Sequence, residues 1–325
     1  MTISNIAVWG LGSHAINRIL PALTKIQSLK LVGVCSRNKV IVDEYAKIYN
    51  CMGWTTPKEM LNDTNIDIVY IAAPIGVHFN LAEQAFKAGK NVWCEKPLTC
   101  NYNNTKTLVL LAERNKVMLA EAFMYLYHPQ FKKIKNLVQD KDNNFGKVKS
   151  VICRFGIPNL ENPGFRNDPD LCGGALWDVA SYTVSAILEL FPQQNAKVLF
   201  AEVNKQPESA VDTDGRAIIR FSNDVTAYLE WGVGVGYKNE IDLWSDNGSF
   251  YTDKIFSKPE NYQPIYRIRD QQGNEFLEDG QKSEQIEVML REFSKILNST
   301  GRIKREHIRI LELAKVMDEI VRFDL

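Results

Sequence analysis

The sequence predicts an α/β protein of two domains, in which a doubly wound parallel sheet precedes an α+β domain with a mostly antiparallel, open sheet. The first observation is the length of 325 residues, about twice the ~150 residues of a typical domain. The second is that apolar strand-like runs alternate with helical patterns through the first third of the chain. The third is that β-rich runs follow one another from about residue 147. We place the domains at 1–122 and 123–325.

The first domain is predicted from strands that are apolar along their whole length. These runs lie at 5–9, 29–35, 66–73, 91–95 and 117–123, and helical patterns lie between them near 16–23, 38–49, 77–88 and 101–115. Each crossover between parallel strands places a helix on the sheet, so both faces of such strands become buried. The order of elements therefore predicts a nucleotide-binding, doubly wound sheet.

The second domain is predicted from β-rich runs joined by Gly, Asn and Asp turns. The runs lie at 147–155, 197–203, 215–221, 225–235 and 239–246. One strongly apolar helix, at 175–190, interrupts them. Turns as short as 222–224 indicate antiparallel neighbours. Two charged helical stretches near 283–298 and 304–322 end the sequence, and we expect them to pack back on the body.

Charge and residue spacing argue against several classes of function. The 39 Lys and Arg residues balance 39 Asp and Glu residues, so no basic excess is available for nucleic acid or an anionic membrane. The longest apolar run, 68–77, is interrupted by Pro74 and is shorter than the ~20 residues that cross a bilayer. The first ten residues lack the pattern of a secretory signal, so we expect a cytoplasmic protein. No His, Cys or Asp spacing resembles a metal site.

A glycine turn directly after the first strand predicts a dinucleotide site. In Gly10-x-Gly12-x-x-Ala15, the first glycine permits a tight turn and the second lets the backbone approach a pyrophosphate. Ala15 lets the helix and the strand pack closely, as in a Rossmann domain. The helix N-terminus at Ser13 and His14 would then face the phosphates with its N–H groups. An ordinary turn is the alternative.

The end of the second strand bears on the choice of dinucleotide. A carboxylate there would bind the ribose diol of NAD, but the strand ends with Cys35-Ser36-Arg37. A hydroxyl beside a guanidinium suits a 2′-phosphate, because arginine offers planar, charge-assisted donors. The sequence therefore favours NADP(H), with NAD(H) as the alternative, and a solvated Arg37 is the competing interpretation.

A lysine follows the fourth long strand, at the sheet edge where ligands bind in doubly wound folds. The triplet is Glu95-Lys96-Pro97. Pro97 biases Lys96 towards an extended backbone, which can aim its ammonium at a nicotinamide. From spacing alone, a surface lysine is the more ordinary interpretation.

With these motifs the chain resembles the glucose-fructose oxidoreductase / inositol dehydrogenase family over nearly its whole length. The segments that carry the resemblance are 10–15, 72–78, Glu95-Lys96-Pro97, 121–124 and 173–182. Tyr182 is similar to the branch that contains glucose-fructose oxidoreductase, dihydrodiol dehydrogenases and dTDP-sugar 3-ketoreductases. The resemblance implies an NAD(P)-dependent oxidoreductase acting on CH–OH groups, which moves a hydride between nicotinamide and a carbon of a sugar.

The resemblance also implies roles for individual residues. Lys96 would be the catalytic lysine, and Asp178 and Tyr182 would line the substrate pocket and take part in catalysis; as i and i+4 they share one helix face. Residues expected to contact the cofactor are Gly10, Gly12, Ser13, His14, Ser36, Arg37, Ala73, Pro74, His78, Glu95, Lys96, Pro97 and Glu121. Family members usually have Thr-Pro-Asn where this chain has Ala73-Pro74-Ile75, which removes two side chains that commonly hold the cofactor.

The expected chemistry leaves the proton donor open. An unperturbed tyrosine has a pKa of about 10, so a neighbouring Lys96 ammonium would favour the Tyr182 phenolate and assist proton transfer. Alternatively, Lys96 donates the proton itself or stabilises the oxyanion.

Specificity is expected from loops around the apolar helix. The loop 153–171 contains Arg166, and the stretch 233–239 resembles dTDP-sugar 3-ketoreductases, which implies reduction of a keto group on a nucleotide-linked sugar. A diphosphate would meet Arg166, Lys238 or Lys258, and a base would meet Tyr237 or Tyr262.

The sequence also leaves two alternative functions open and leads us to expect an oligomer. One alternative is a dehydrogenase of a free sugar or a cyclic trans-diol; another is a catalytically silent dinucleotide sensor, for which the residues Lys96, Asp178 and Tyr182 would not be needed. The family resemblance further implies a homodimer or homotetramer formed through the C-terminal sheet.

Overall fold

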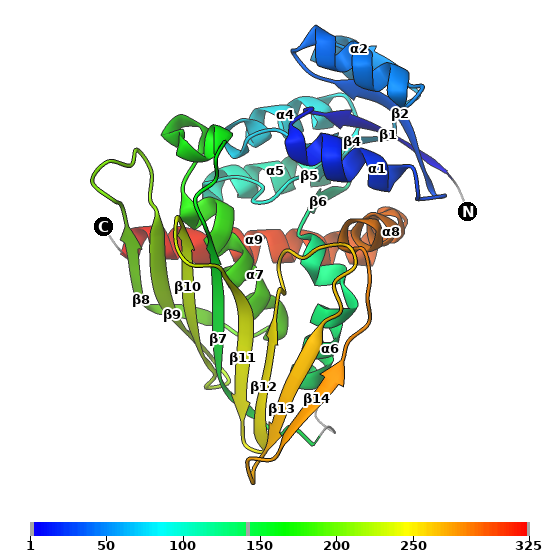
Figure 1. Ribbon diagram of the computed structural model, residues 1–325. Coiled ribbons are helices and arrows are strands. Elements are labelled where there is room, and N and C mark those ends of the chain that lie inside the picture. The colour runs from blue at the N-terminus through cyan, green and yellow to red at the C-terminus, as the bar shows by residue number, and fades with distance from the viewer. Residues whose placement is uncertain (1–2, 141–143, 324–325) are drawn as a thin grey trace. The chain divides into compact units, whose positions relative to one another are not determined.

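The computed structural model describes residues 3–140 and 144–323 (Figure 1). The chain divides into two compact units. Unit 1 contains the residues up to Phe123 together with Ile286–Leu311, and unit 2 contains Met124–Gln285 together with the residues from Glu312 onward.

Unit 1 is built on a six-stranded parallel sheet, which confirms the predicted doubly wound fold. Its order is β3-β2-β1-β4-β5-β6. The strands are β1 Ser4–Trp9, β2 Leu29–Cys35, β3 Met52–Trp54, β4 Ile68–Ile71, β5 Asn91–Cys94 and β6 Leu119–Glu121. The order reverses at β1, which pairs with both β2 and β4. Dinucleotides bind at this kind of switch point in doubly wound sheets.

The helices of unit 1 are α1 Leu20–Leu23 after a π-helical turn at Ala15–Ile19, α2 Lys39–Ile48, α3 Pro57–Asn62, α4 Ile75–Lys87, α5 Tyr102–Asn115, α8 Gln285–Leu297 and the first half of α9 Thr300–Phe323. Asparagine side chains cap the starts of two of these helices, α2 and α5. The Asn38 side chain accepts from Val40 N at 3.1 Å and so caps α2. Helix α8 packs on the sheet, where the Phe293 ring lies 4.8 Å from the Trp93 ring.

Unit 2 is built on an eight-stranded sheet, and the predicted α+β domain is confirmed. The order is β14-β13-β12-β11-β7-β10-β9-β8, in which only the pair β7 and β10 is parallel among the described residues. The strands are β7 Val148–Ile157, β8 Ala196–Asn204, β9 Asp214–Phe221, β10 Thr226–Val233, β11 Lys238–Ser245, β12 Gly248–Asp253, β13 Ile265–Asp270 and β14 Glu275–Asp279. The structure adds β12 to β14 to the five predicted runs.

Helices cover one face of this sheet. Figure 1 shows α6 Pro129–Gln139 and α7 Ser181–Leu190 on the same side of the strands. Helix α7 continues a π-helical turn, Leu176–Ala180, and nearly all of its side chains are buried. Among the described residues, only Pro169–Leu190 is long and apolar enough to cross a membrane, and 78% of its most apolar window is buried inside the protein, as in a core helix.

Candidate active site

The two glycines of the turn after β1 differ in their surroundings: the fold requires Gly10 but does not require Gly12. Gly10 has φ +107°, and a Cβ there would lie 2.5 Å from Ala72 O. A Cβ on Gly12 would meet no described atom within 4 Å. The packing of unit 1 therefore requires glycine at residue 10, whereas the open space at Gly12 fits close approach of a pyrophosphate.

Substitution of the two glycines is expected to separate folding from cofactor binding. Gly10→Ala should destabilise the fold by at least about 2 kcal/mol, because the left-handed backbone and the clash with Ala72 both oppose a Cβ. Gly12→Val should leave the urea unfolding midpoint near that of the wild type but weaken NADPH binding at least about tenfold, since its side chain enters the phosphate space. Urea unfolding and NADPH fluorescence titration measure the two effects. Unchanged NADPH affinity in Gly12→Val would contradict the assignment.

The Ser36-Arg37 loop lies beside this turn. Gly10 N donates to Cys35 O at 2.9 Å, which ties the end of β2 to the turn. Arg37 is exposed, and it has no ion-pair partner among the described residues. An unpaired, exposed guanidinium at this edge can meet a phosphate without first breaking an ion pair.

Glu95 connects the helix after the glycine turn to the loop that carries Lys96. Its Oε1 lies 3.0 Å from His14 Nε2 and accepts from the Tyr70 hydroxyl at 2.7 Å. Burial raises the pKa of Glu95, but His14, the Tyr70 hydrogen bond and the Lys96 ammonium outweigh burial and lower it. Glu95 is therefore an ionised carboxylate next to Lys96.

His78 fixes the backbone on the other side of the same loop. The Lys96-Pro97 peptide bond is cis. The enclosed His78 ring places Nδ1 3.1 Å from Pro97 O and Nε2 2.8 Å from Ala73 O. Burial lowers the pKa of His78. Because both nitrogens face backbone carbonyls, any contribution of His78 to cofactor binding acts through the two loops that it joins.

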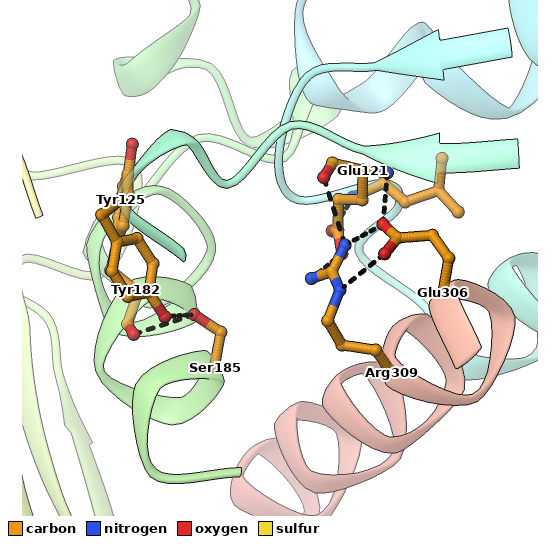
Figure 2. A network of polar contacts seen from close by, with 7 residues as sticks. Glu121, Tyr125, Tyr182, Ser185, Glu306 and Arg309 are labelled. Atoms are coloured by element: carbon orange, nitrogen blue, oxygen red, sulfur yellow. Dashed lines mark hydrogen bonds and ion pairs between the residues drawn. The ribbon is translucent and has the colours of Figure 1, made fainter. Parts of the chain in front are cut away.

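Glu121, at the end of β6, also contacts the loop at residues 95–98 that carries Lys96, here called the lysine loop. Its Oε1 accepts from Leu98 N at 2.7 Å, and Arg309 of α9 lies beside its other oxygen (Figure 2). Burial raises the pKa of Glu121 to about 7, although Arg309 acts in the opposite direction. The partners Glu306 and Arg309 were not found by sequence reasoning, because they lie in a terminal helix without a motif.

In unit 2, the two glycines before the apolar helix bring Arg166 to Asp178. A Cβ on Gly173 would lie 2.4 Å from Arg166 O, and Gly174 N donates to the same oxygen at 2.9 Å. The Arg166 Nε then donates to Asp178 Oδ2 at 2.6 Å. The glycines therefore allow the loop to fold tightly enough for this ion pair to form.

Asp212 holds the start of the same helix and was also missed by sequence reasoning. Its Oδ2 accepts from Leu176 N at 2.6 Å, and a Cβ on Gly174 would lie 2.0 Å from its Oδ1. Burial raises the pKa of Asp212 to about 6 despite hydrogen bonds from backbone N–H groups. Asp212 thus acts as a distant cap that positions the turn carrying Asp178.

Tyr182 lies in an aromatic cluster with 8% of its surface exposed. Its ring centroid is 5.2 Å from Phe155, 5.5 Å from Phe256 and 5.9 Å from Tyr125. Ser185 Oγ bonds both the Tyr125 hydroxyl, at 2.6 Å, and Tyr182 O, at 2.9 Å (Figure 2). The cluster fixes the orientation of the ring, as a proton-transferring group requires.

The residues expected to bind a nucleotide differ in their exposure. Tyr237 is 53% exposed, and its hydroxyl accepts from Asn239 Nδ2 at 3.2 Å. Lys238 pairs with Glu240 at 3.2 Å, and the Tyr262 hydroxyl donates to the Asp253 carboxylate. Of these side chains, Tyr237 offers the most accessible ring for a base.

Lys258, considered above for a diphosphate, is only 4% exposed. Its Nζ donates to Ile255 O at 2.9 Å and to Gln285 Oε1 at 3.3 Å. Burial lowers the pKa of Lys258 to about 7, against the opposite effect of Glu284. Burial and the Lys258 charge also lower the pKa of His128 to about 4. The ammonium therefore belongs to the interior of unit 2.

Lys258 is expected to make folding stability depend on pH. Between pH 7 and its ordinary pKa of 10.5, the unfolded lysine is protonated while the folded one is neutral, so the free energy of unfolding rises with pH. The contribution approaches about 1.4 kcal/mol per pH unit, and below pH 7 the destabilisation is complete. Urea unfolding at pH 7.0, 7.5, 8.0 and 8.5 should give a slope that Lys258→Met reduces. Equal slopes in the two proteins would contradict the burial of a titrating amine.

The predicted catalytic groups are thus divided between the units. Lys96 belongs to unit 1, whereas Asp178 and Tyr182 belong to unit 2. Among the residues that the structure describes, no group of three or more His, Cys, Asp or Glu side chains is arranged to hold a metal ion.

Comparison with known proteins identifies related chains. Residues 4–123 match the model of an oxidoreductase family with an NAD-binding Rossmann fold, GFO_IDH_MocA, and residues 131–251 match the GFO/IDH/MocA C-terminal domain. The chain is 31% identical over 263 residues to a dTDP-3,4-didehydro-2,6-dideoxy-α-D-glucose 3-reductase of Saccharopolyspora spinosa, covering 81% of this chain and 78% of that one. It is 26% identical over 315 residues to the reductase of the same name from Streptomyces antibioticus, covering 97% and 95%.

The fold is shared with solved structures. A 3-ketoreductase from Actinomadura kijaniata, in complex with NADP and TDP-benzene, has a TM-score of 0.93 at 24% identity and covers 99% of this chain and 98% of its own. An aldose-aldose oxidoreductase from Caulobacter crescentus has a TM-score of 0.89 at 20% identity and covers 99% and 97%.

Proposed function

Because the chain belongs to the Gfo/Idh/MocA family of oxidoreductases, we propose that it is an NADP(H)-dependent reductase of a keto group on a nucleotide-linked sugar. The observation that carries the proposal is the position of Lys96. It lies on a loop held by hydrogen bonds with His78 and Glu121, at the carboxyl ends of the parallel strands, where dinucleotides bind. Its 3-reductase relatives from two genera support the substrate class, and the match to one of them spans nearly the whole chain.

The proposed reaction adds one hydride and one proton to a carbonyl group. The hydride for the carbonyl carbon would come from NADPH when it is bound. The Tyr182 hydroxyl gives its proton to the carbonyl oxygen, so that C=O becomes CH–OH and a phenolate remains. The role proposed for the Lys96 ammonium is to stabilise the negative charge that develops on the carbonyl oxygen. Solvent then returns a proton to Tyr182.

Cofactor preference is assigned to the loop after β2. Arg37→Ala is expected to weaken NADP(H) binding about 10- to 100-fold while changing NAD(H) affinity little, because only NADP carries a 2′-phosphate for the guanidinium. Lys39→Ala is the matched control, since Lys39 is an exposed cation two residues further on that already pairs with Asp43 at 2.7 Å. Fluorescence titration with both reduced dinucleotides measures the effect. Equal losses for NADPH and NADH in Arg37→Ala would refute the assignment.

Substrate recognition is assigned to residues of unit 2. The exposed ring of Tyr237 suits stacking on a base. Arg166 is already paired with Asp178, so its guanidinium would bind a substrate oxygen together with that carboxylate. Tyr237 is thus proposed to bind the nucleotide, and Arg166 and Asp178 are proposed to bind the sugar.

A substrate screen tests the function directly. NADPH oxidation is followed by absorbance with dTDP-linked keto sugars, free keto sugars and cyclic diketones, and the reverse reaction with free sugars and cyclic diols. Turnover of the nucleotide-linked sugars alone is the expected result. Preference for free sugars or diols would favour the dehydrogenase alternative, and NADPH binding without turnover of any compound would favour a dinucleotide sensor.

The assembly proposed is a homodimer or homotetramer through the uncovered face of the unit 2 sheet. Tyr228 and Trp244 alternate with buried neighbours on β10 and β11 and are 43% and 64% exposed. Large exposed aromatic residues on a sheet face are typical of interaction surfaces. Light scattering of the purified protein measures the number of subunits.

A further inference from the structure

We propose that Glu306 and Arg309 of α9 are positioning residues for Lys96, acting through Glu121. The inference rests on the proposed role of Lys96 and goes beyond it, because it assigns a part in the reaction to a helix nearly 200 residues away in the sequence. Figure 2 shows Glu306 and Arg309 reaching from α9 to the end of β6.

The first step is that α9 pairs with the backbone of an edge strand. Strand β6 is the outermost strand of its sheet, so one side of its backbone has no neighbouring strand. Glu121 N donates to Glu306 Oε1 at 3.2 Å, and Arg309 Nη2 donates to Glu121 O at 3.1 Å. These side chains satisfy the buried backbone groups that a further strand would satisfy. They thereby hold the N–H and the C=O of Glu121 on the open side of the strand.

The second step is that Glu121 transmits this order to the lysine loop. Its Oε1 accepts from Leu98 N at 2.7 Å, and its Oε2 lies 3.5 Å from Arg309 Nη1. His78 meets Pro97 O on the preceding residue. The two residues that follow Lys96 are therefore held by two different buried side chains, one from α4 and one from β6.

The third step is electrostatic. The Lys96 charge lowers the pKa values of two described carboxyl groups, Glu95 and Glu121, so both groups interact electrostatically with it. Burial favours the neutral form of Glu121, and so does the like charge of Glu306, whereas Arg309 and Lys96 favour the carboxylate. Loss of Arg309 should therefore protonate Glu121 at neutral pH and remove a negative charge near Lys96. Removal of the Glu121 charge alone, as in Glu121→Gln, takes one stabilising negative charge away from the Lys96 ammonium.

Arg309→Met, Glu306→Gln and Glu121→Gln test the proposal with three readouts. Hydrogen exchange, read by mass spectrometry, should be at least about tenfold faster at the Leu98 amide in Arg309→Met. The pH midpoint for acetylation of Lys96 by acetic anhydride should fall in Glu121→Gln, which removes a negative charge and no positive one. For substrate reduction, kcat should fall about 10- to 100-fold while KM changes little, as for residues that orient a reacting group. Glu121→Gln keeps an acceptor for Leu98 N and removes only the negative charge of Glu121. It therefore still tests the effect of that charge if Arg309→Met does not fold.

The control is Arg322→Met, which removes an exposed ion pair with Asp318 from the same helix. It should leave all three readouts at the wild-type level. Unchanged exchange in folded Arg309→Met, or an unchanged acetylation midpoint in folded Glu121→Gln, would overturn the proposal, as would an equal response in Arg322→Met. Exchange and acetylation need no substrate. If they respond while no carbonyl compound is reduced, the proposed function fails and the positioning of Lys96 stands.

Discussion

Lys96→Met and Tyr182→Phe are each expected to lower kcat for carbonyl reduction by at least about 10³-fold while NADPH binding is retained. Tyr182→Phe removes the proposed proton donor, and Lys96→Met removes the positive charge at the developing oxyanion. Groups of either kind contribute about 10²- to 10⁴-fold to the rate in enzymes. Methionine keeps most of the lysine volume, and phenylalanine keeps the ring within its aromatic cluster. Neither substitution should therefore unfold the protein.

Single-turnover reduction, with NADPH binding measured separately, distinguishes chemistry from affinity. Tyr125→Phe is the matched control, since it removes a hydroxyl from a ring of the same cluster that we assign no proton-transfer role. It should retain kcat within about threefold, because its hydroxyl bonds Ser185 within the core. Equal losses in Tyr125→Phe and Tyr182→Phe would mean that the cluster matters only for packing, and the roles assigned to Tyr182 would be wrong.

The local parts of the fold could be predicted because short-range patterns encode them. Buried parallel strands read as continuous apolar runs, and the turn of Gly10 and Gly12 follows the first of them directly. Strand β3 was missed because it is three residues long and only Trp54 in it is buried. Strands β13 and β14 were missed because they carry many charged residues and are largely exposed.

The partners of the candidate site could not be predicted, because tertiary packing alone brings them together. Glu121 is expected to contact the cofactor, and the structure adds that its carboxylate contacts Leu98 and Arg309, which is 188 residues away in sequence. No periodicity or motif connects residues at such separations. The same holds for Asp212, which supports the helix of Asp178 from 36 residues downstream of Leu176. Motifs pointed to the proposed reacting groups, whereas the residues that support them can be seen only in the three-dimensional structure.

The pairing of Arg166 with Asp178 leads to the second large expected effect. Asp178 is 8% exposed and precedes Tyr182 by about one helical turn, so its carboxylate and the proposed proton donor share a helix face. Asp178→Asn should lower kcat/KM about 100-fold, because the amide removes the charge that orients both Arg166 and a substrate hydroxyl. Arg166→Lys should cost about tenfold, since an ammonium cannot present two parallel donors.

Stability measurements separate this role from a structural one. Arg166 is partly exposed, so solvent screens the ion pair and its loss should change the free energy of unfolding by only about 1 kcal/mol. Steady-state kinetics and thermal unfolding of both single variants and the double variant form a thermodynamic cycle. Strong coupling in kcat/KM with little coupling in the free energy of unfolding would mean that Arg166 and Asp178 bind the substrate together. Near-wild-type kcat/KM in Asp178→Asn would instead leave the ion pair as a brace for the loop, because a carboxylate that binds substrate cannot lose its charge without loss of rate.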